Sequence, residues 1–189
     1  NNIEIPQVTS METWPSVHFK ETGYAVLRSG TKTVVMKYGP HGGGHGHPDK
    51  LSISIHDGEK EIVSDMGTCA YGVPAFTKWY RKTLSHSTLT VDAKDQKEST
   101  GKLLAFKAYK DGGEVSAEAP DVYSGVTMER KLILKKNKLT DILTARSDEQ
   151  HLYDYVLILT EKPVFSQTGE VIILNDSPSY NYIKNAIVR

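Results

Sequence analysis

The residues best suited to chemistry are histidines set among glycines. Four of the seven histidines lie either in the segment 38–50, which reads YGPHGGGHGHPDK, or at position 86. In extended backbone, side chains two positions apart point to the same face, so His45 and His47 project together. One of the pair can then bind a metal ion while the other faces a substrate.

Four glycines lie between His41 and His47. They remove side-chain bulk and permit positive φ, which lets another chain or a ligand approach the backbone closely. A solvated glycine loop with incidental histidines explains this segment equally well when it is taken alone. The next forty residues favour the functional interpretation.

A hairpin is predicted to bring a carboxylate back to the Gly/His segment. Residues 51–56 alternate between apolar and polar, which is typical of a strand with one buried face. Asp57-Gly58 is a strong hairpin signal, and 61–65 returns antiparallel. Asp65 is therefore expected beside residues 50 and 51, a few positions from His47.

A second histidine follows from another alternating run, 87–92. If Leu89 and Val91 face the core, His86 points the other way, toward the Gly/His segment. Two histidines, or two with a carboxylate, and an open position are the usual ligands of a non-structural zinc site. Cys69 is a competing ligand but is interpreted as a small buried residue, and Asp65 could equally accept turn amides at a strand end.

The remaining pattern predicts an all-β protein, an antiparallel β-sandwich of two or more layered sheets. Short strand-like segments recur about every ten residues with turn signals between them. Further segments of this kind are 24–28, 33–38, 103–109, 114–119, 128–134, 139–144, 152–160 and 171–174. Residues 1–16 are expected to be a lead-in or linker and 17–189 the domain, with a short helical turn at 79–81.

Composition sets broad bounds. The formal net charge is zero, so bulk electrostatics gives no argument for a nucleic-acid or membrane partner. The single cysteine excludes an internal disulfide framework. No apolar run reaches the roughly 18 residues of a membrane span, and no segment of this sequence is expected to be a signal peptide. Asn1-Asn2 is not a natural start, which suggests a processed chain or a piece of a longer one.

Several motifs together resemble a known family. These are the segment 38–51, Asp65-x-Gly67, 70–72 (AYG), 79–81 (WYR) and 85–88 (SHST). They resemble the C-terminal β-sandwich of the heparinase II/III-like polysaccharide lyases, which include oligoalginate and heparin or heparan sulfate lyases. The motif match covers roughly 23–96, and the Gly/His segment is most similar to the alginate-type branch.

The resemblance implies roles for individual residues. His47, Asp65 and His86 become metal ligands, with Zn²⁺ the usual ion, although another divalent ion is compatible. His45 becomes the histidine that faces substrate, and Tyr71 matches a tyrosine that lines the cleft. Ser87 stands where the family commonly has Asn, so a ligand contact from that position is in doubt.

The resemblance also implies partners and reaction. An N-terminal α/α-toroid domain of the same protein would supply further catalytic groups, the substrate would be an acidic polysaccharide or oligosaccharide, and the location would be periplasmic or secreted. The lyase cleaves a uronate polymer by β-elimination, and this chain alone is expected to be inactive. The alternatives are a non-catalytic carbohydrate-binding or scaffold domain and a zinc hydrolase, since two histidines and a carboxylate could hold a hydroxide.

Other polar and aromatic residues receive structural interpretations. Trp79 and Tyr80 are expected in packing, His41 in support of the loop, and Asp49 as an acceptor for loop amides after Pro48. The remaining histidines, assigned no function, are His18, His56 and His151.

Overall fold

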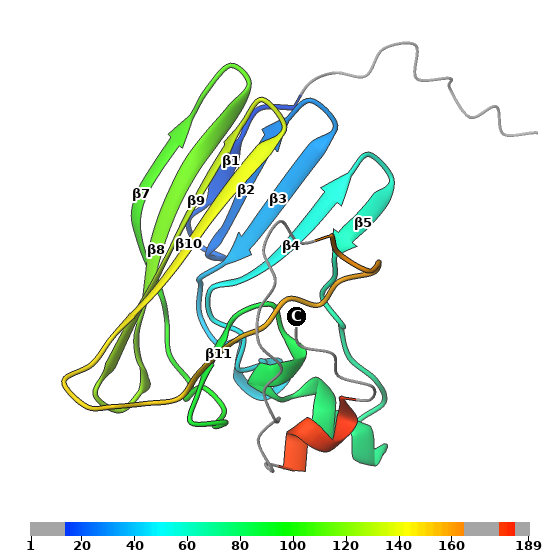
Figure 1. The fold of residues 1–189 in the computed structure, drawn as a ribbon, viewed down its shortest axis with the longest axis vertical. Coiled ribbons are helices and arrows are strands. Elements are labelled where there is room, and N and C mark those ends of the chain that lie inside the picture. The colour runs from blue at the N-terminus through cyan, green and yellow to red at the C-terminus, as the bar shows by residue number, and fades with distance from the viewer. Residues whose placement is uncertain (1–13, 165–177, 184–189) are drawn as a thin grey trace, which may run out of the picture.

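The computed structural model describes residues 14–164 and 178–183. Two antiparallel sheets pack against each other (Figure 1). One has the order β1 (Val17–Phe19), β2 (Tyr24–Ser29), β3 (Lys32–Lys37), β4 (Ser52–Asp57), β5 (Lys60–Val63). The other has the order β10 (Lys138–Arg146), β9 (Val126–Lys135), β8 (Gly112–Tyr123), β7 (Lys102–Ala108). The predicted all-β sandwich is confirmed, while 1–13 and the expected strand at 171–174 lie outside the described residues.

The hairpins form where turn residues can adopt positive φ. Gly30 (φ 55°) joins β2 to β3, and Gly58 (φ 61°) joins β4 to β5. Lys136 (φ 48°) and Asn137 (φ 62°) both enter the left-handed region between β9 and β10. Such two-residue turns match the right-handed twist of the flanking strands. The alternating sequence therefore becomes a series of neighbouring antiparallel pairs.

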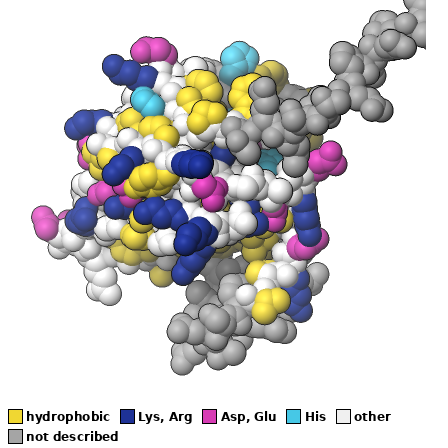
Figure 2. Space-filling model, turned by 90° about the horizontal axis from the view of Figure 1, so that it is seen from above, with side chains coloured by type: hydrophobic (Ala, Val, Ile, Leu, Met, Phe, Trp, Pro, Cys, Tyr) yellow, Lys and Arg dark blue, Asp and Glu magenta, His cyan; other side chains and the backbone are white. Residues whose placement is uncertain are grey.

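The core lies between the two sheets and follows the period-two pattern. On β9, every second residue from Val126 to Leu134 is buried, and the residues between them are exposed or half-buried. Leu27 and Met36 of the first sheet are fully buried in the same cluster as Val115 and Leu132 of the second. On the face in Figure 2, basic and acidic side chains are interspersed with apolar ones, in keeping with the balanced charge.

A third, two-stranded sheet joins β6 (Leu89–Val91) to β11 (Tyr153–Tyr155). The predicted strand 152–160 is thus mostly irregular. Its backbone changes partner along its length: Val156 N–H donates to Thr88 O at 2.9 Å, whereas Thr160 N–H donates to Ile62 O at 3.2 Å. Because it leaves β6 to reach β5, it cannot keep one continuous ladder.

Helical turns gather at the end of the sandwich from which β4 begins (Figure 1). They are η1 (Gly43–His45), η2 (Phe76–Tyr80), η3 (Thr83–Ser85) and η4 (Pro178–Tyr182). The expected turn at 79–81 is a π-helical turn that begins three residues earlier and ends at Tyr80. Trp79 stacks on Tyr182 with ring centroids 5.6 Å apart, consistent with a packing role. Within the described ranges, no helix is long and apolar enough to cross a membrane.

Candidate metal and substrate site

The Gly/His loop is shaped by its glycines. Gly42 (φ 84°) and Gly43 (φ 61°) take left-handed conformations that start the turn η1, and Gly46 N–H closes it on Gly43 O at 2.9 Å. Gly46 is buried, and a Cβ there would lie 1.8 Å from the carbonyl oxygen of His41. The loop backbone therefore folds onto itself at His41 and carries His45 outward.

His45 and Tyr71 meet at the exposed surface of this loop. Their side chains approach to 2.6 Å between Nδ1 of His45 and the hydroxyl of Tyr71, and Tyr71 is 62% exposed. Tyr71 also packs edge-on against the buried ring of Phe76, at 4.6 Å between centroids, which fixes its direction. The two residues predicted to face substrate are thus brought together in a solvent-accessible position.

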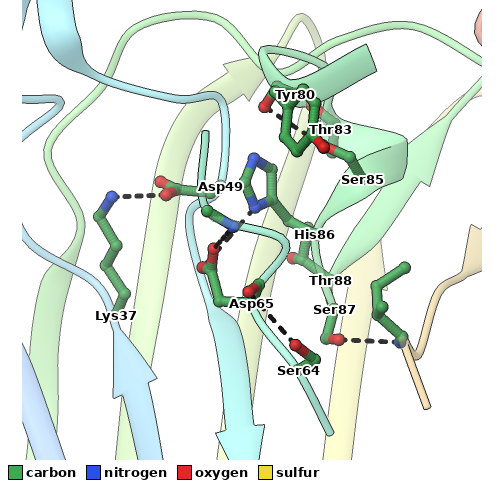
Figure 3. Close-up of polar contacts among 12 residues, drawn as sticks. Lys37, Asp49, Ser64, Asp65, Tyr80, Thr83, Ser85, His86, Ser87 and Thr88 are labelled. Carbon is green, nitrogen blue, oxygen red and sulfur yellow. Dashed lines mark hydrogen bonds and ion pairs between the residues drawn. The ribbon is translucent and has the colours of Figure 1, made fainter. Parts of the chain in front are cut away.

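Of the three predicted metal ligands, Asp65 and His86 lie together, and the ring of His47 packs on His86. The rings of His47 and His86 lie 5.2 Å apart between centroids, and Nδ1 of His86 lies 3.8 Å from Oδ2 of Asp65. Figure 3 shows the His86 imidazole facing the carboxylate of Asp65, with the carboxylate of Asp49 on the same side of the ring. Asp65 also accepts the Gly67 N–H at 2.8 Å, so the alternative role of accepting a turn amide is present as well.

The imidazole of His86 is buried without a hydrogen-bond partner in the part of the chain that the structure describes. His86 is 1% exposed, and neither ring nitrogen has a hydrogen-bond partner among the described residues. Buried polar atoms in folded proteins are nearly always paired, and a bound ion is one of the partners that can satisfy them. The donor set of imidazole and carboxylate fits a Zn²⁺ ion.

Asp49 is a further member of this cluster. One ligand atom each from Asp49, Asp65 and His86 lies within 4.8 Å of the others. Asp49 was expected to accept loop amides, but Oδ2 accepts Nζ of Lys37 at 2.5 Å, and Nζ of the buried Lys50 lies 3.5 Å from Oδ1. The group that the structure brings together is therefore Asp49, Asp65 and His86, with Asp49 in the place predicted for His47, and the two lysines beside Asp49 compete with an ion for its charge.

The electrostatics suit deprotonated ligands. The neighbouring His86, together with the Gly67 amide, lowers the pKa of Asp65 to about 2. Burial, reinforced by His86, lowers the pKa of His47 and so favours its neutral imidazole. Metal ligands must be deprotonated to bind, and both shifts favour the deprotonated forms of Asp65 and His47.

Cys69 is not part of this constellation. The expectation of a small buried residue is wrong, because Cys69 is half-buried in a largely exposed segment between Asp65 and Tyr71. Its sulfur contacts Ala70 O at 3.8 Å. A segment with many polar and small residues and no periodicity does not fold into the core, so its cysteine stays near the surface.

Two of the other histidines, His41 and His151, occupy structural positions. His41 packs beneath Gly46, and its Nε2 lies 3.4 Å from Glu98, which agrees with support of the loop. His151 bridges Asp92 at 2.9 Å and Ser147 at 3.2 Å. Both observations agree with the structural interpretation of these rings.

Comparisons with known proteins agree with the fold and the motifs. The sequence model of the family described as heparinase II/III-like, C-terminal matches residues 11–157. An exo-oligoalginate lyase of Saccharophagus degradans is 28% identical over 150 residues, covering 66% of this chain and 20% of that protein. An alginate lyase of Stenotrophomonas maltophilia is 28% identical over 162 residues, covering 71% and 22%.

Solved structures show the same fold. A heparinase III gene product superimposes with a TM-score of 0.73 at 18% identity, over 84% of this chain and 26% of that one. The chain spans about a fifth of the length of the two curated relatives. Because the family match covers well over half of its residues, the chain belongs to the heparinase II/III-like, C-terminal family.

Proposed function

We propose that this chain is the C-terminal domain of a polysaccharide lyase that cleaves uronate-containing polyanions by β-elimination. The observation that carries the proposal is the exposed His45–Tyr71 pair, with His45 in the same loop as the half-buried His47, whose ring packs on the buried His86 next to the exposed Asp65. Two sequence relatives are named as an exo-oligoalginate lyase and an alginate lyase, which supports alginate or a related uronate polymer as the proposed substrate class.

The chemistry explains why these side chains are needed. A lyase removes the C5 proton of a uronate, which lies α to a carboxylate and is weakly acidic, and the bond at C4 then breaks. Neutralising that carboxylate stabilises the enolate-like transition state. His45 can do so as a hydrogen-bond donor or cation, while the hydroxyl of Tyr71 holds its ring through Nδ1 and can exchange a proton with the sugar.

The proposed ion would have a positioning role. His47, Asp65 and His86 would hold Zn²⁺, and the bound ion would supply a fixed positive charge that ties the loop to β5 and to the segment before β6. His47 is two residues from His45, so fixing one ring limits the movement of the other. The residues of the chain still perform the substrate contacts.

A complete active site requires groups beyond those found here. Elimination needs a base for C5, a group for the departing oxygen and a neutraliser for the carboxylate, all held in one geometry. We propose that an N-terminal α/α-toroid domain of the same protein supplies the rest across an interdomain cleft. A periplasmic or secreted location belongs to the same proposal.

Product absorbance tests the reaction. The longest natural form of the protein should release unsaturated uronates, which absorb in the short ultraviolet, from alginate or a glycosaminoglycan. A zinc hydrolase would instead release reducing ends without that absorbance, and a binding domain would release neither. Either of the last two results would reject the lyase.

Metal analysis tests the ligand set. The purified chain should carry close to one equivalent of zinc, and His86→Ala should lose it and melt at a lower temperature. At a free metal concentration 100 times Kd, a bound ion adds about 2.7 kcal/mol to the free energy of unfolding. His56→Ala, on β4 and outside the site, is the matched control and should keep the metal. Absence of any metal from a chelator-free preparation would remove the site.

A further inference from the structure

Arg130 lies at a position where the alternating pattern of its strand predicts an apolar residue. It lies on the buried face of β9 between Met128 and Leu132, and it is 0% exposed. Burying a guanidinium is unfavourable unless its donors are paired. The hydrogen-bond partners of the guanidinium therefore indicate the role of this buried charge.

Each nitrogen of the guanidinium donates to a partner. Nε and Nη2 bind the two carboxylate oxygens of Asp141 at 2.9 and 2.5 Å, and Nη2 also reaches the Tyr155 hydroxyl at 2.9 Å. Nη1 donates to two backbone carbonyls, Leu51 O and Ser87 O, at 2.7 Å each. Asp141 and Tyr155 hold one side of the fork, which aims the other at the two carbonyls.

Those two carbonyls belong to the two segments that carry the histidine ligands. Leu51 ends the loop that carries His47, and its φ of 61° is a left-handed conformation that a leucine rarely adopts. Ser87 directly follows His86. The same two segments are also joined by the Thr88 hydroxyl, which donates to Lys50 O at 2.7 Å.

We propose that Arg130 is a positioning residue that sets the separation of His47 and His86 by bonding both segments from within the core. The proposal rests on the metal site described above. An apolar residue at this position could fill space but would leave Leu51 O without this donor. Lysine has a single nitrogen, so it cannot bind both carbonyls and Asp141 as a planar fork does.

Cobalt binding to the purified chain separates positioning from general stability. Arg130→Lys should weaken Co²⁺ affinity roughly tenfold or more, as loss of a residue supporting metal ligands generally does, and should change the visible spectrum of the bound ion. Leu134→Ala, on the same buried face of β9 and four residues away, is the matched control. It lowers stability through a cavity and should leave affinity and spectrum unchanged.

Further variants keep the test decisive. If Arg130→Lys does not fold, Asp141→Asn, which loosens the guanidinium but keeps both carbonyl bonds available, should still weaken cobalt binding severalfold. If the wild-type chain binds no metal, the proposed metal site is wrong, and the positioning role of Arg130 is tested by NMR instead. Arg130→Lys should shift the signals of the carbon-bound protons on the His86 imidazole, and Leu134→Ala should not. Wild-type affinity and spectrum in both site variants, or equal effects in Leu134→Ala, would overturn the inference.

Discussion

Gly46 offers a direct test of how tightly the Gly/His loop must be folded. Its backbone angles, φ −72° and ψ 154°, suit any residue, so alanine meets no conformational penalty there. The obstacle is steric, because the added Cβ would lie 1.8 Å from His41 O and 2.7 Å from Cδ2 of the same residue. Gly44 is exposed, lies outside the left-handed region, and would place its Cβ in open space.

The size of the effect follows from that contact. Ordinary van der Waals contact begins at 3.4 Å, so His41 and Gly46 must separate by about 1.6 Å to admit the methyl group. Metal–ligand distances tolerate only about 0.2 Å, and His47 is the next residue. Gly46→Ala should therefore weaken metal binding more than tenfold, and overpacking should lower the free energy of unfolding by about 1–3 kcal/mol.

Metal competition with a chelator and thermal melting measure both effects on the purified chain. Gly44→Ala should change the free energy of unfolding by less than about 0.5 kcal/mol, as surface substitutions usually do, and should bind metal as the wild type does. If Gly46→Ala matched Gly44→Ala in affinity and melting temperature, the close approach at His41 would not be what positions His47.

Three more outcomes are expected. His47→Ala should lose the metal, whereas His45→Ala should keep it. In the longest natural form of the protein, His45→Ala should lower turnover strongly. Equal metal loss in the two variants would show that the roles of His45 and His47 are misassigned. Burial, reinforced by Asp154, raises the pKa of Tyr180 to about 12, above roughly 10 in an unfolded chain. Its contribution to stability is therefore complete below pH 10 and lost as the pH rises through 12, so the wild type should lose melting temperature faster than Tyr180→Phe over that range; parallel curves would contradict this. The 189-residue chain alone should give no unsaturated product from alginate, heparan sulfate or hyaluronan, and robust elimination would mean that it holds a complete active site.

The strand pairs could be predicted because their periodicity and turns are local. Alternation over 51–56 with Asp57-Gly58 is enough to specify β4, its turn and β5. The stretch 152–160 is continuously apolar over 155–159, but whether it forms a ladder depends on which neighbouring strand is available. There the chain moves from β6 to β5, and no local pattern shows that change.

The proposed metal ligands could be predicted from their residue types. The residues that surround them in the folded chain could not be predicted from the sequence. The pairing of Asp49 with Lys37 depends on how a glycine-rich loop closes, and such a loop has no periodicity to interpret. Arg130 did leave a signal, since it interrupts the apolar register of 126–134. Its partners Leu51 and Ser87 are 79 and 43 residues away, so only the folded chain reveals them.

The origin of the ligands in three separate loops has a kinetic consequence. Positions 47, 65 and 86 come together only after β3, β4, β5 and β6 have been placed, and such distant contacts form late because loop closure precedes them. In small zinc modules, metal binding and folding are a single event. Here the ion would arrive at a finished scaffold, so it should slow unfolding while leaving the folding rate nearly unchanged. The metal would thereby lengthen the lifetime of the native state without guiding the chain toward it.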